Sequence, residues 1–469
     1  MGGGLLQLVA YGAQDVYLTG NPQITFFKVV YRRHTNFAME AIQQTFNGNA
    51  AFGNTVYCQI SRNGDLIHRT YLEVSLPKLN SYVYNNTATP RYVNYIGQRL
   101  LKTITLEIGG QQIDKHYADW LYIWNELSLP IGKHEGYRYM VGADSDVTSG
   151  VESGTTLDPW EGVKSTLYVP LEFWFCRNIG LALPLIALQY HEVKIKIEFE
   201  QLNNCVYKMS GNNTAALVSS GGVTGEATDL AALQGNLDAS IWVDYIFLDT
   251  DERRRFAQLS HEYLIEQLQF TGQETLNAGA NRIKLNFNHP CKELIWVAKS
   301  NTSSSVNQWY NYTTTGSGSG IPTGATAFTL PLSANATFEA NMPNTLNVDA
   351  YSSNLIIGVV PSGNNPFNSC LIQLNGNDRF AERNGTYFNY VQQYQHHTNI
   401  TDNKGINVYS FALKPEDHQP SGSLNMSRID TAVLSVNSAY TASANINIYA
   451  VNYNVLRILS GMGGLAYSN

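Results

Sequence analysis

Residues 193–200 read Val193-Lys194-Ile195-Lys196-Ile197-Glu198-Phe199-Glu200, and this stretch decides the fold class of the chain. Apolar and charged residues alternate with a period of two, so that one face of a strand is apolar and the other is charged. A strand with one buried and one wet face is typical of antiparallel sheets. The stretch therefore predicts a β-rich fold whose sheets face water on one side.

The same alternation recurs on both sides of the middle of the chain. It appears in residues 71–76 and 103–108, and again in residues 282–287. A chain of 469 residues exceeds what one hydrophobic core supports, since cores stop growing at about 250 to 300 residues. We therefore expect an all-β fold of two tandem antiparallel sandwiches with short connecting helices. A jelly roll is one way in which such sheets close their edges.

One helix is predicted within the first half. Asp114 can cap it, Pro130 ends it, and the residues between them show helical periodicity. The apolar stripe consists of Tyr117, Trp120, Leu121, Trp124 and Leu127. Such a stripe more often packs into a core than binds a cofactor, so we expect these side chains to be buried.

A cluster of charges lies between the two halves: Asp251, Glu252, Arg253, Arg254 and Arg255. The charged fraction of the whole chain is only 14%. A helix is predicted from a cap at residue 250 to residue 263, and we interpret it as a connector whose charges fix the angle between the sandwiches. The alternative is an exposed helix face whose ion pairs contribute about 0 to 1 kcal/mol each.

Charge, cysteines and hydropathy exclude several classes of protein. A net charge of -7 gives no reason to bind nucleic acid directly. The longest apolar run, residues 179–188, contains Pro184 and is too short to span a membrane. Residues 1–6 lack the basic region of a signal peptide, so we expect synthesis inside the cell. The five cysteines form no Cys-x-x-Cys pair and are expected to be buried free thiols: Cys58, Cys176, Cys205, Cys291 and Cys370.

Motifs for catalysis are incomplete. His191-Glu192 and His261-Glu262 begin like a zinc-protease helix, but isoleucine stands where the second histidine would be. The pair His396-His397 lacks acidic residues at a fixed spacing, which disfavours a metal site. We expect no enzymatic activity, no cofactor and no metal.

Three blocks of sequence carry a resemblance to a known family. They are residues 21–37, residues 243–258 and residues 375–430, which include Asn375-Gly376-Asn377-Asp378-Arg379-Phe380 and His396-His397-Thr398. Together they resemble the major capsid proteins of nucleocytoplasmic large DNA viruses, and they cover essentially the whole chain.

The resemblance implies a double jelly roll, three copies of which form a pseudo-hexagonal capsomer of an icosahedral virion capsid. Its partners would be neighbouring capsomers and minor capsid proteins, with an internal membrane beneath the shell and synthesis in the host cytoplasm or a viral factory. The expected division is an N-terminal arm (1–21), a first jelly roll (22–249), a connecting helix segment (250–267), a second jelly roll (268–456) and a C-terminal tail (457–469). Loops 142–162 and 301–324 should face outward, and replacing the three arginines of the connector should reduce trimer formation.

A carbohydrate-binding jelly roll, acting as a lectin-like surface or attachment protein, is the alternative. Its aromatic platform would be Trp309, Tyr310 and Tyr312. Glycans on outer loops also stay open, because seven asparagines begin Asn-x-Ser/Thr sequons: Asn85, Asn301, Asn311, Asn335, Asn384, Asn399 and Asn425. An asparagine-rich chain generates such triplets by chance.

Overall fold

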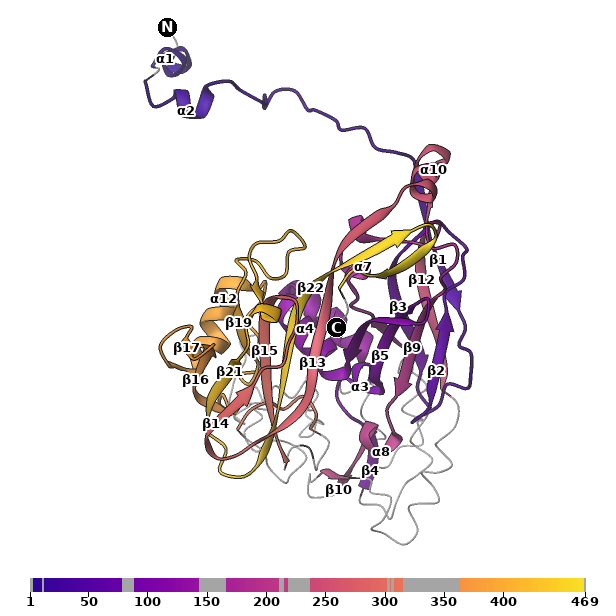
Figure 1. Cartoon of the computed structure of the whole chain (residues 1–469), viewed down its shortest axis with the longest axis vertical. Helices are drawn as coiled ribbons and strands as arrows, with labels where there is room; N and C mark the ends of the chain where they lie inside the picture. The colour runs from indigo at the N-terminus through magenta and orange to yellow at the C-terminus, as the bar shows by residue number, and fades with distance from the viewer. Residues whose placement is uncertain are drawn as a thin grey trace, which may run out of the picture. The chain divides into compact units, whose positions relative to one another are not determined.

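The computed structural model describes residues 3–10, 12–77, 88–142, 166–210, 215–217, 237–301, 304, 308–314 and 363–467. Met1–Phe37 forms one compact unit and Ala38–Asn469 another. The first unit contains helices α1 (Gly3–Val9) and α2 (Val16–Thr19). Both jelly rolls lie in the second unit (Figure 1). None of the helices in the described ranges is long and apolar enough to cross a membrane.

The first lobe contains two main antiparallel sheets, one of five strands and one of four. Sheet 1a has the order β1 (Phe37–Gln44), β12 (Asp238–Leu248), β3 (Leu66–Ser75), β7 (Thr166–Pro170), and β8 (Leu183–Pro184) also pairs with β3. Sheet 1b has the order β2 (Thr55–Gln59), β9 (Val193–Phe199), β5 (Leu101–Ile108), β6 (Gln111–Tyr117). A small sheet joins β11 (Ala215–Leu217), β10 (Val206–Ser210) and β4 (Ala88–Tyr92). Strand β9 alternates buried and half-buried residues, which confirms the strand predicted from residues 193–200.

The second lobe repeats this construction. Sheet 2a has the order β13 (His261–Leu276), β22 (Ala444–Leu459), β15 (Pro290–Ser300), β19 (Asn407–Ser410), extended by β20 (Leu424–Asn425) and β23 (Met462–Leu465). Sheet 2b has the order β14 (Gly279–Lys284), β21 (Ala432–Ser438), β16 (Phe367–Leu374), β17 (Asn377–Asp378), and β18 (Arg383–Asn384) also pairs with β16.

The two lobes have the same topology. The eight strands that form these paths can be numbered 1 to 8 in chain order within each lobe. Each lobe then has one sheet of order 1-8-3-6 and one of order 2-7-4-5. Pairing of the first strand with the last, and of the second with the seventh, is the strand arrangement of a jelly roll. The expected pair of tandem antiparallel sandwiches is confirmed, and each sandwich encloses a core of its own.

Short helices connect the strands. In the first lobe they are α3 (Ile96–Leu100), α4 (Ala118–Ser128), α5 (Ile131–Val141), α7 (Trp174–Arg177), η1 (Ile179–Leu181) and α8 (Leu202–Cys205). Helix α10 (Thr250–Gln258) joins the lobes, and the second lobe adds η2 (Tyr387–Val391), α12 (Gln392–His396) and η3 (Met426–Arg428). The predicted stripe on α4 is largely buried, as expected.

Both helix boundaries predicted from the sequence need correction. Asp114 does not cap α4 but lies in β6, where its carboxylate accepts a hydrogen bond from the backbone N–H of Leu268 in β13. The connector helix is capped by Asp249 and ends at Gln258. Tyr263 belongs to β13, because this strand pairs with β22 along its whole length and that ladder outweighs helical periodicity.

Candidate assembly site

Helix α4 lies in the junction between the two lobes (Figure 1). Its side chains Trp120, Tyr122, Ile123, Trp124 and Leu127 form one buried cluster with second-lobe side chains Ile295, Val297, Tyr310, Tyr312, Ile406, Val408, Tyr449 and Val451. The rings of Tyr122 and Tyr310 stack with centroids 4.4 Å apart. Burial of large aromatic side chains dominates the energetics of cores and interfaces. The stripe that the sequence predicted as core packing therefore packs one lobe against the other.

The aromatic cluster contains a buried ion pair. Lys299 of β15 donates from Nζ to both carboxylate oxygens of Asp119 on α4, each at 2.7 Å. The Tyr312 hydroxyl and the Asn447 amide also donate to Asp119, at 3.3 Å each. Burial lowers the pKa of Lys299, although Asp119 opposes this effect. The pair fixes the position of α4 on sheet 2a with polar contacts from three elements.

A second ionic group crosses the junction beside α7. Arg177 donates to Glu266 of β13 at 3.1 Å, and Glu266 also accepts a hydrogen bond from the buried Lys292 at 2.6 Å. The guanidinium of Arg177 stacks on Trp124 at 4.0 Å. Burial raises the pKa of the neighbouring Glu172, and Arg177 counteracts that shift. Arg177 thus bridges a helix of the first lobe to a strand of the second.

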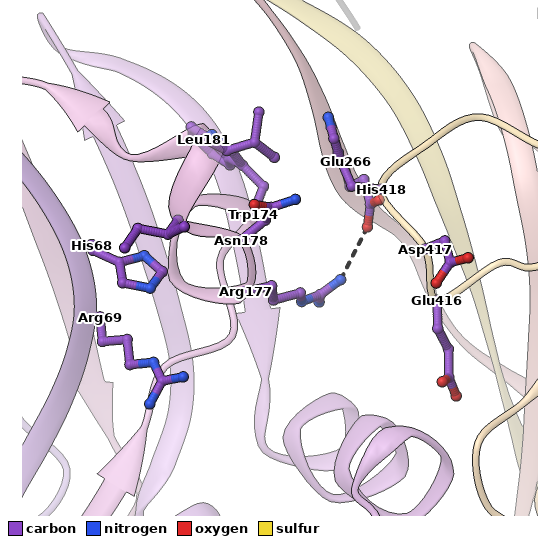
Figure 2. A pocket seen from close by; sticks show the side chains of 11 residues that line it. His68, Arg69, Trp174, Arg177, Asn178, Leu181, Glu266, Glu416, Asp417 and His418 are labelled. Carbon is purple, nitrogen blue, oxygen red and sulfur yellow. Dashed lines mark hydrogen bonds and ion pairs between the residues drawn. The ribbon is translucent and has the colours of Figure 1, made fainter. Parts of the chain in front are cut away.

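A cavity of about 520 Å³ opens next to this bridge (Figure 2). Figure 2 shows His68, Arg69 and Arg177 on the first-lobe side, facing Glu416 and Asp417 on a second-lobe loop. The two sides carry opposite charges. Among the described residues, no cluster of His, Cys, Asp and Glu suited to a metal ion occurs, in this cavity or elsewhere. The two walls therefore suit contact between lobes.

The loop that carries Glu416 is tied to the second lobe by a buried histidine. His397 contacts Glu293 at 3.0 Å through Nε2 and Glu416 at 2.8 Å through Nδ1. Burial alone would lower the pKa of His397, but the two carboxylates outweigh burial and raise it to about 9. Among the described residues, the adjacent His396 contacts the Leu413 carbonyl, so the histidine pair does not converge on one site.

The charged connector packs on the first lobe. The Nε atom of Arg253 donates to Asp65 at 2.8 Å, and Asp65 also accepts a hydrogen bond from the N–H of Leu248. Phe256 packs beside a small cluster of Leu66, Ala182 and Ile246. Asp251, Arg254 and Arg255 are exposed and Glu252 is half-buried. Among the ion pairs within the described ranges, Arg253 is the connector's single contributor, and its contact does not reach the second lobe.

The sequons follow a local turn chemistry. In Asn384-Gly385-Thr386 and Asn311-Tyr312-Thr313, the asparagine Oδ1 accepts hydrogen bonds from the N–H and the hydroxyl of the residue two positions on. The amide of Asn425 accepts one from the N–H of Ser427 in the same way. Such Asx turns favour Asn and Ser/Thr at this spacing without any glycan.

Accessibility separates the five sequons whose asparagines lie within the described residues. Asn311 is buried, so it is not an acceptor on the folded chain, and the Asn399 amide donates to the Glu126 carbonyl. Asn301, Asn384 and Asn425 are exposed. Asn85 and Asn335 lie outside the described residues.

The aromatic platform proposed for carbohydrate does not exist as a surface. Tyr310 and Tyr312 are buried in the junction, and Trp309 donates its Nε1–H to the Asn204 carbonyl at 2.9 Å with Arg99 over its ring. Residues 308–314 therefore face inward, in contrast to the expected outward loop. The rest of loop 301–324 apart from residues 301 and 304, and loop 142–162 apart from Gly142, lie outside the described residues.

The site residues that sequence reasoning missed are the buried ions of the junction. Lys292, Glu293 and Lys299 stand within the otherwise apolar β15, of which nine consecutive residues are buried. Charged residues are rarely buried unless they are paired, so their presence in such a strand was the available signal. Their partners lie in α4, β13 and the loops, far away in sequence. None of these partners is marked by a charge within an apolar strand, so the sequence did not indicate them. The five cysteines are buried free thiols, as predicted.

Comparisons with known proteins cover the whole chain. Residues 25–249 match the family model described as major capsid protein N-terminus, and residues 252–464 match that of the large eukaryotic DNA virus major capsid protein. The major capsid proteins of Phaeocystis pouchetii virus and Pyramimonas orientalis virus are 47% and 48% identical, with 100% of both chains covered.

Solved structures agree in fold. A chain of the quasi-atomic PBCV-1 virus capsid superposes with a TM-score of 0.68 at 40% identity, covering 95% of this chain and 100% of that chain. The Faustovirus major capsid protein gives a TM-score of 0.66 at 14% identity, covering 96% and 94%, which shows the shared fold alone.

Proposed function

Because the chain belongs to the major capsid proteins of large eukaryotic DNA viruses and forms part of the virion shell, we propose that three copies associate into a capsomer of six similar lobes. The supporting observation is the duplicated strand order, 1-8-3-6 and 2-7-4-5, in two lobes held together by one buried junction. Rotational closure of three such chains gives a ring of near six-fold shape. A ring of this shape fits a hexagonal lattice.

The junction makes the chain suitable as a rigid building block. Aromatic packing through α4 and the bridge Arg177–Glu266 both hold one lobe against the other. A lattice requires each subunit to present its contacts at fixed angles, and a stiff junction supplies that geometry. We propose no catalytic role for the chain.

We propose the division into an N-terminal arm (1–21), a first jelly roll (22–249), a connecting segment (250–267), a second jelly roll (268–456) and a C-terminal tail (457–469). Ile265, Leu456 and Ile458 pack into the core of the first lobe although they belong to strands of sheet 2a. Strand β23 pairs with the end of β22, and His191 of the first lobe contacts the backbone of Gly463 in it. The ends of β13 and β22 therefore contribute to the core of the first lobe while they pair with each other in sheet 2a, so the two lobes share these strands at the proposed boundaries.

The partners in the shell are also proposals. The family membership suggests contacts with neighbouring capsomers, with minor capsid proteins and with an internal membrane beneath the shell. Glycans would attach at the exposed sequons Asn301, Asn384 or Asn425. Intact-mass analysis of protein purified from virions tests the glycans. A mass equal to that of the unmodified chain removes this part of the proposal.

The oligomeric state tests the main proposal directly. Purified protein measured by size-exclusion chromatography with light scattering should show about three times the chain mass of 52.1 kDa. Negative-stain electron microscopy should show particles of hexagonal outline. A folded monomer at micromolar concentration, or particles with two-fold or four-fold outlines, would contradict the trimer.

A further inference from the structure

The connection between the fifth and sixth strands is helical in both lobes. In the first lobe α4 and α5 lie between β6 and β7, and in the second lobe η2 and α12 lie between β17 and β19. Because the lobes share one strand order, these connections are topological equivalents. What one of them does in the structure indicates what the other is placed to do.

In the first lobe this connection covers a sheet of the second. Helix α4 packs on the outer face of sheet 2a, where Ile295 and Val297 of β15 and Tyr449 and Val451 of β22 are all buried. The inner face of the same strands, with Leu294 and Trp296, belongs to the core of the second lobe. A complete contact between adjacent lobes thus consists of a helix on an outer sheet face.

The described residues cover the equivalent face of sheet 1a less completely. Strands β3, β12 and β7 occupy the positions of β15, β22 and β19, and their outward residues include Tyr71, Trp242 and Tyr168. The rings of Tyr71 and Trp242 lie parallel at 6.4 Å, and Tyr168 is 39% exposed. A cavity of about 740 Å³ opens on this face; Tyr71, Tyr168 and Asp244 line it on the sheet, and Trp124 of α4 and Met140 of α5 also line it, so the face is hollow there rather than packed.

The equivalent helix of the second lobe exposes large side chains. On the η2–α12 segment, Tyr390 is 40%, Val391 38% and Tyr394 77% exposed, whereas Phe388 packs into the core of the lobe. Figure 1 shows α12 at the side of the second lobe away from sheet 1a of the same chain. The helix and the open sheet face therefore do not meet within one copy.

We propose that the η2–α12 segment of one copy docks on the outer face of sheet 1a of the next copy, with Tyr390, Val391 and Tyr394 against Tyr71, Tyr168 and Trp242. This contact repeats between chains the contact that α4 makes with sheet 2a within a chain. It is head-to-tail, and such a contact generates a closed ring when its rotation completes a circle. The inference rests on the proposed trimer and names the surfaces that close it.

The chemistry of the two contacts differs in a way that fits their roles. The contact within the chain combines buried aliphatic and aromatic side chains with the ion pair Lys299–Asp119, like a core. The open face carries tyrosine and tryptophan, which are enriched in interfaces between separately folded subunits, and Glu73 and Asp244 lie on the same face. Tyrosine and tryptophan are also the residues most enriched among interface hot spots.

Site-specific cross-linking tests the contact in the full-length protein. The photoreactive residue p-benzoylphenylalanine at position 394 should give a dimer band on a denaturing gel. Its cross-linked peptides should map to the strand segments around Tyr71, Tyr168 or Trp242. The same probe at Tyr190, which is 75% exposed on the first lobe, is the matched control and should not label sheet 1a.

Substitutions give the second readout. Tyr394→Asp and Tyr168→Asp should each raise the concentration needed for trimer formation by at least about tenfold, because each places a charge in the contact, while Tyr190→Asp leaves it unchanged. Circular dichroism of the variants verifies that the lobes stay folded. Wild-type protein that never forms a trimer refutes the proposed function itself. A normal trimer whose cross-links from position 394 map elsewhere, or that tolerates both aspartates, refutes this contact alone.

Discussion

Sheets 2a and 1a occupy the same position in two lobes of identical strand order, yet their outer faces differ. Ile295 and Val297 on sheet 2a are fully buried beneath α4, whereas Tyr168 on sheet 1a is 39% exposed. One chain thus carries a completed lobe-to-lobe contact and an open copy of the same surface. The difference teaches that the completed contact stabilises the single chain, while the open face contributes to stability only when a partner covers it.

Truncating one aromatic residue in each face should show the largest difference in stability between the buried face of sheet 2a and the open face of sheet 1a. Trp120→Ala on α4 should lower the free energy of unfolding by about 3 to 5 kcal/mol, since the cavity left in the junction cannot collapse fully. Tyr168→Ala on the open face should change it by less than about 0.5 kcal/mol in the monomer. Urea denaturation below the concentration of association, monitored by circular dichroism, measures both. Equal losses would mean that sheet 1a is covered within the chain.

Removing one partner of the buried ion pair also tests how much the contact between the lobes stabilises the single chain. Asp119→Asn leaves the Lys299 ammonium buried without its counter-charge and should cost about 3 kcal/mol of stability. The exposed pair Arg457–Glu262 supplies the control, and Glu262→Gln should cost less than about 0.5 kcal/mol. Thermal unfolding of the three proteins compares them. A small loss in Asp119→Asn would show that water reaches Lys299.

The pH dependence of stability tests how firmly the cavity loop is held. The folded-state pKa of His397 is raised from 6.5 to about 9, so the folded chain binds its proton more tightly than the unfolded chain. Its contribution is therefore complete below pH 6.5 and is lost as the pH rises through 9, on the order of 1 to 3 kcal/mol. His397→Gln should flatten this part of the stability profile.

The neighbouring histidine is the control for that measurement. His396→Gln should leave the decline between pH 6.5 and 9 intact, because within the described part of the chain its ring contacts a backbone carbonyl rather than a carboxylate. Urea midpoints at half-unit steps of pH give the profiles. The hypothesis is wrong if His397→Gln and His396→Gln show the same slope.

Most of the fold could be predicted from local periodicity in the sequence. Alternation in residues 193–200 predicted β9 correctly, and the apolar stripe of Trp120 and Trp124 predicted a buried α4. Periodicity shows which face of an element is buried, but it does not show which residues pack against that face. The stripe packs on Ile295 and Tyr449, far away in sequence, so the junction itself was not predicted.

The candidate site was harder to predict than the fold. The density of charge at residues 251–255 drew attention to the connector, but its charges are largely in water. Lys299 is one of three charged residues in an otherwise apolar strand, and its partner Asp119 lies 180 positions away. Clustered charge is conspicuous in a sequence, whereas a buried pair is recognisable only when the fold brings its members together.

The connector supplies the smallest expected effect and separates its two interpretations. Arg253→Ala should cost about 1 kcal/mol, because the buried carboxylate of Asp65 loses a charged donor while keeping the Leu248 N–H. Arg254→Ala and Arg255→Ala should each change stability by less than about 0.5 kcal/mol, since both side chains are exposed. If the cluster fixes the angle between the lobes, replacing all three arginines must also reduce trimer yield in light scattering. If the charged cluster is instead a solvated helix face packed on the first lobe, the triple variant still forms trimers, and its free energy of unfolding falls only by the contribution of Arg253. The contact of Arg253 with Asp65 favours the second outcome, because Asp65 belongs to the first lobe.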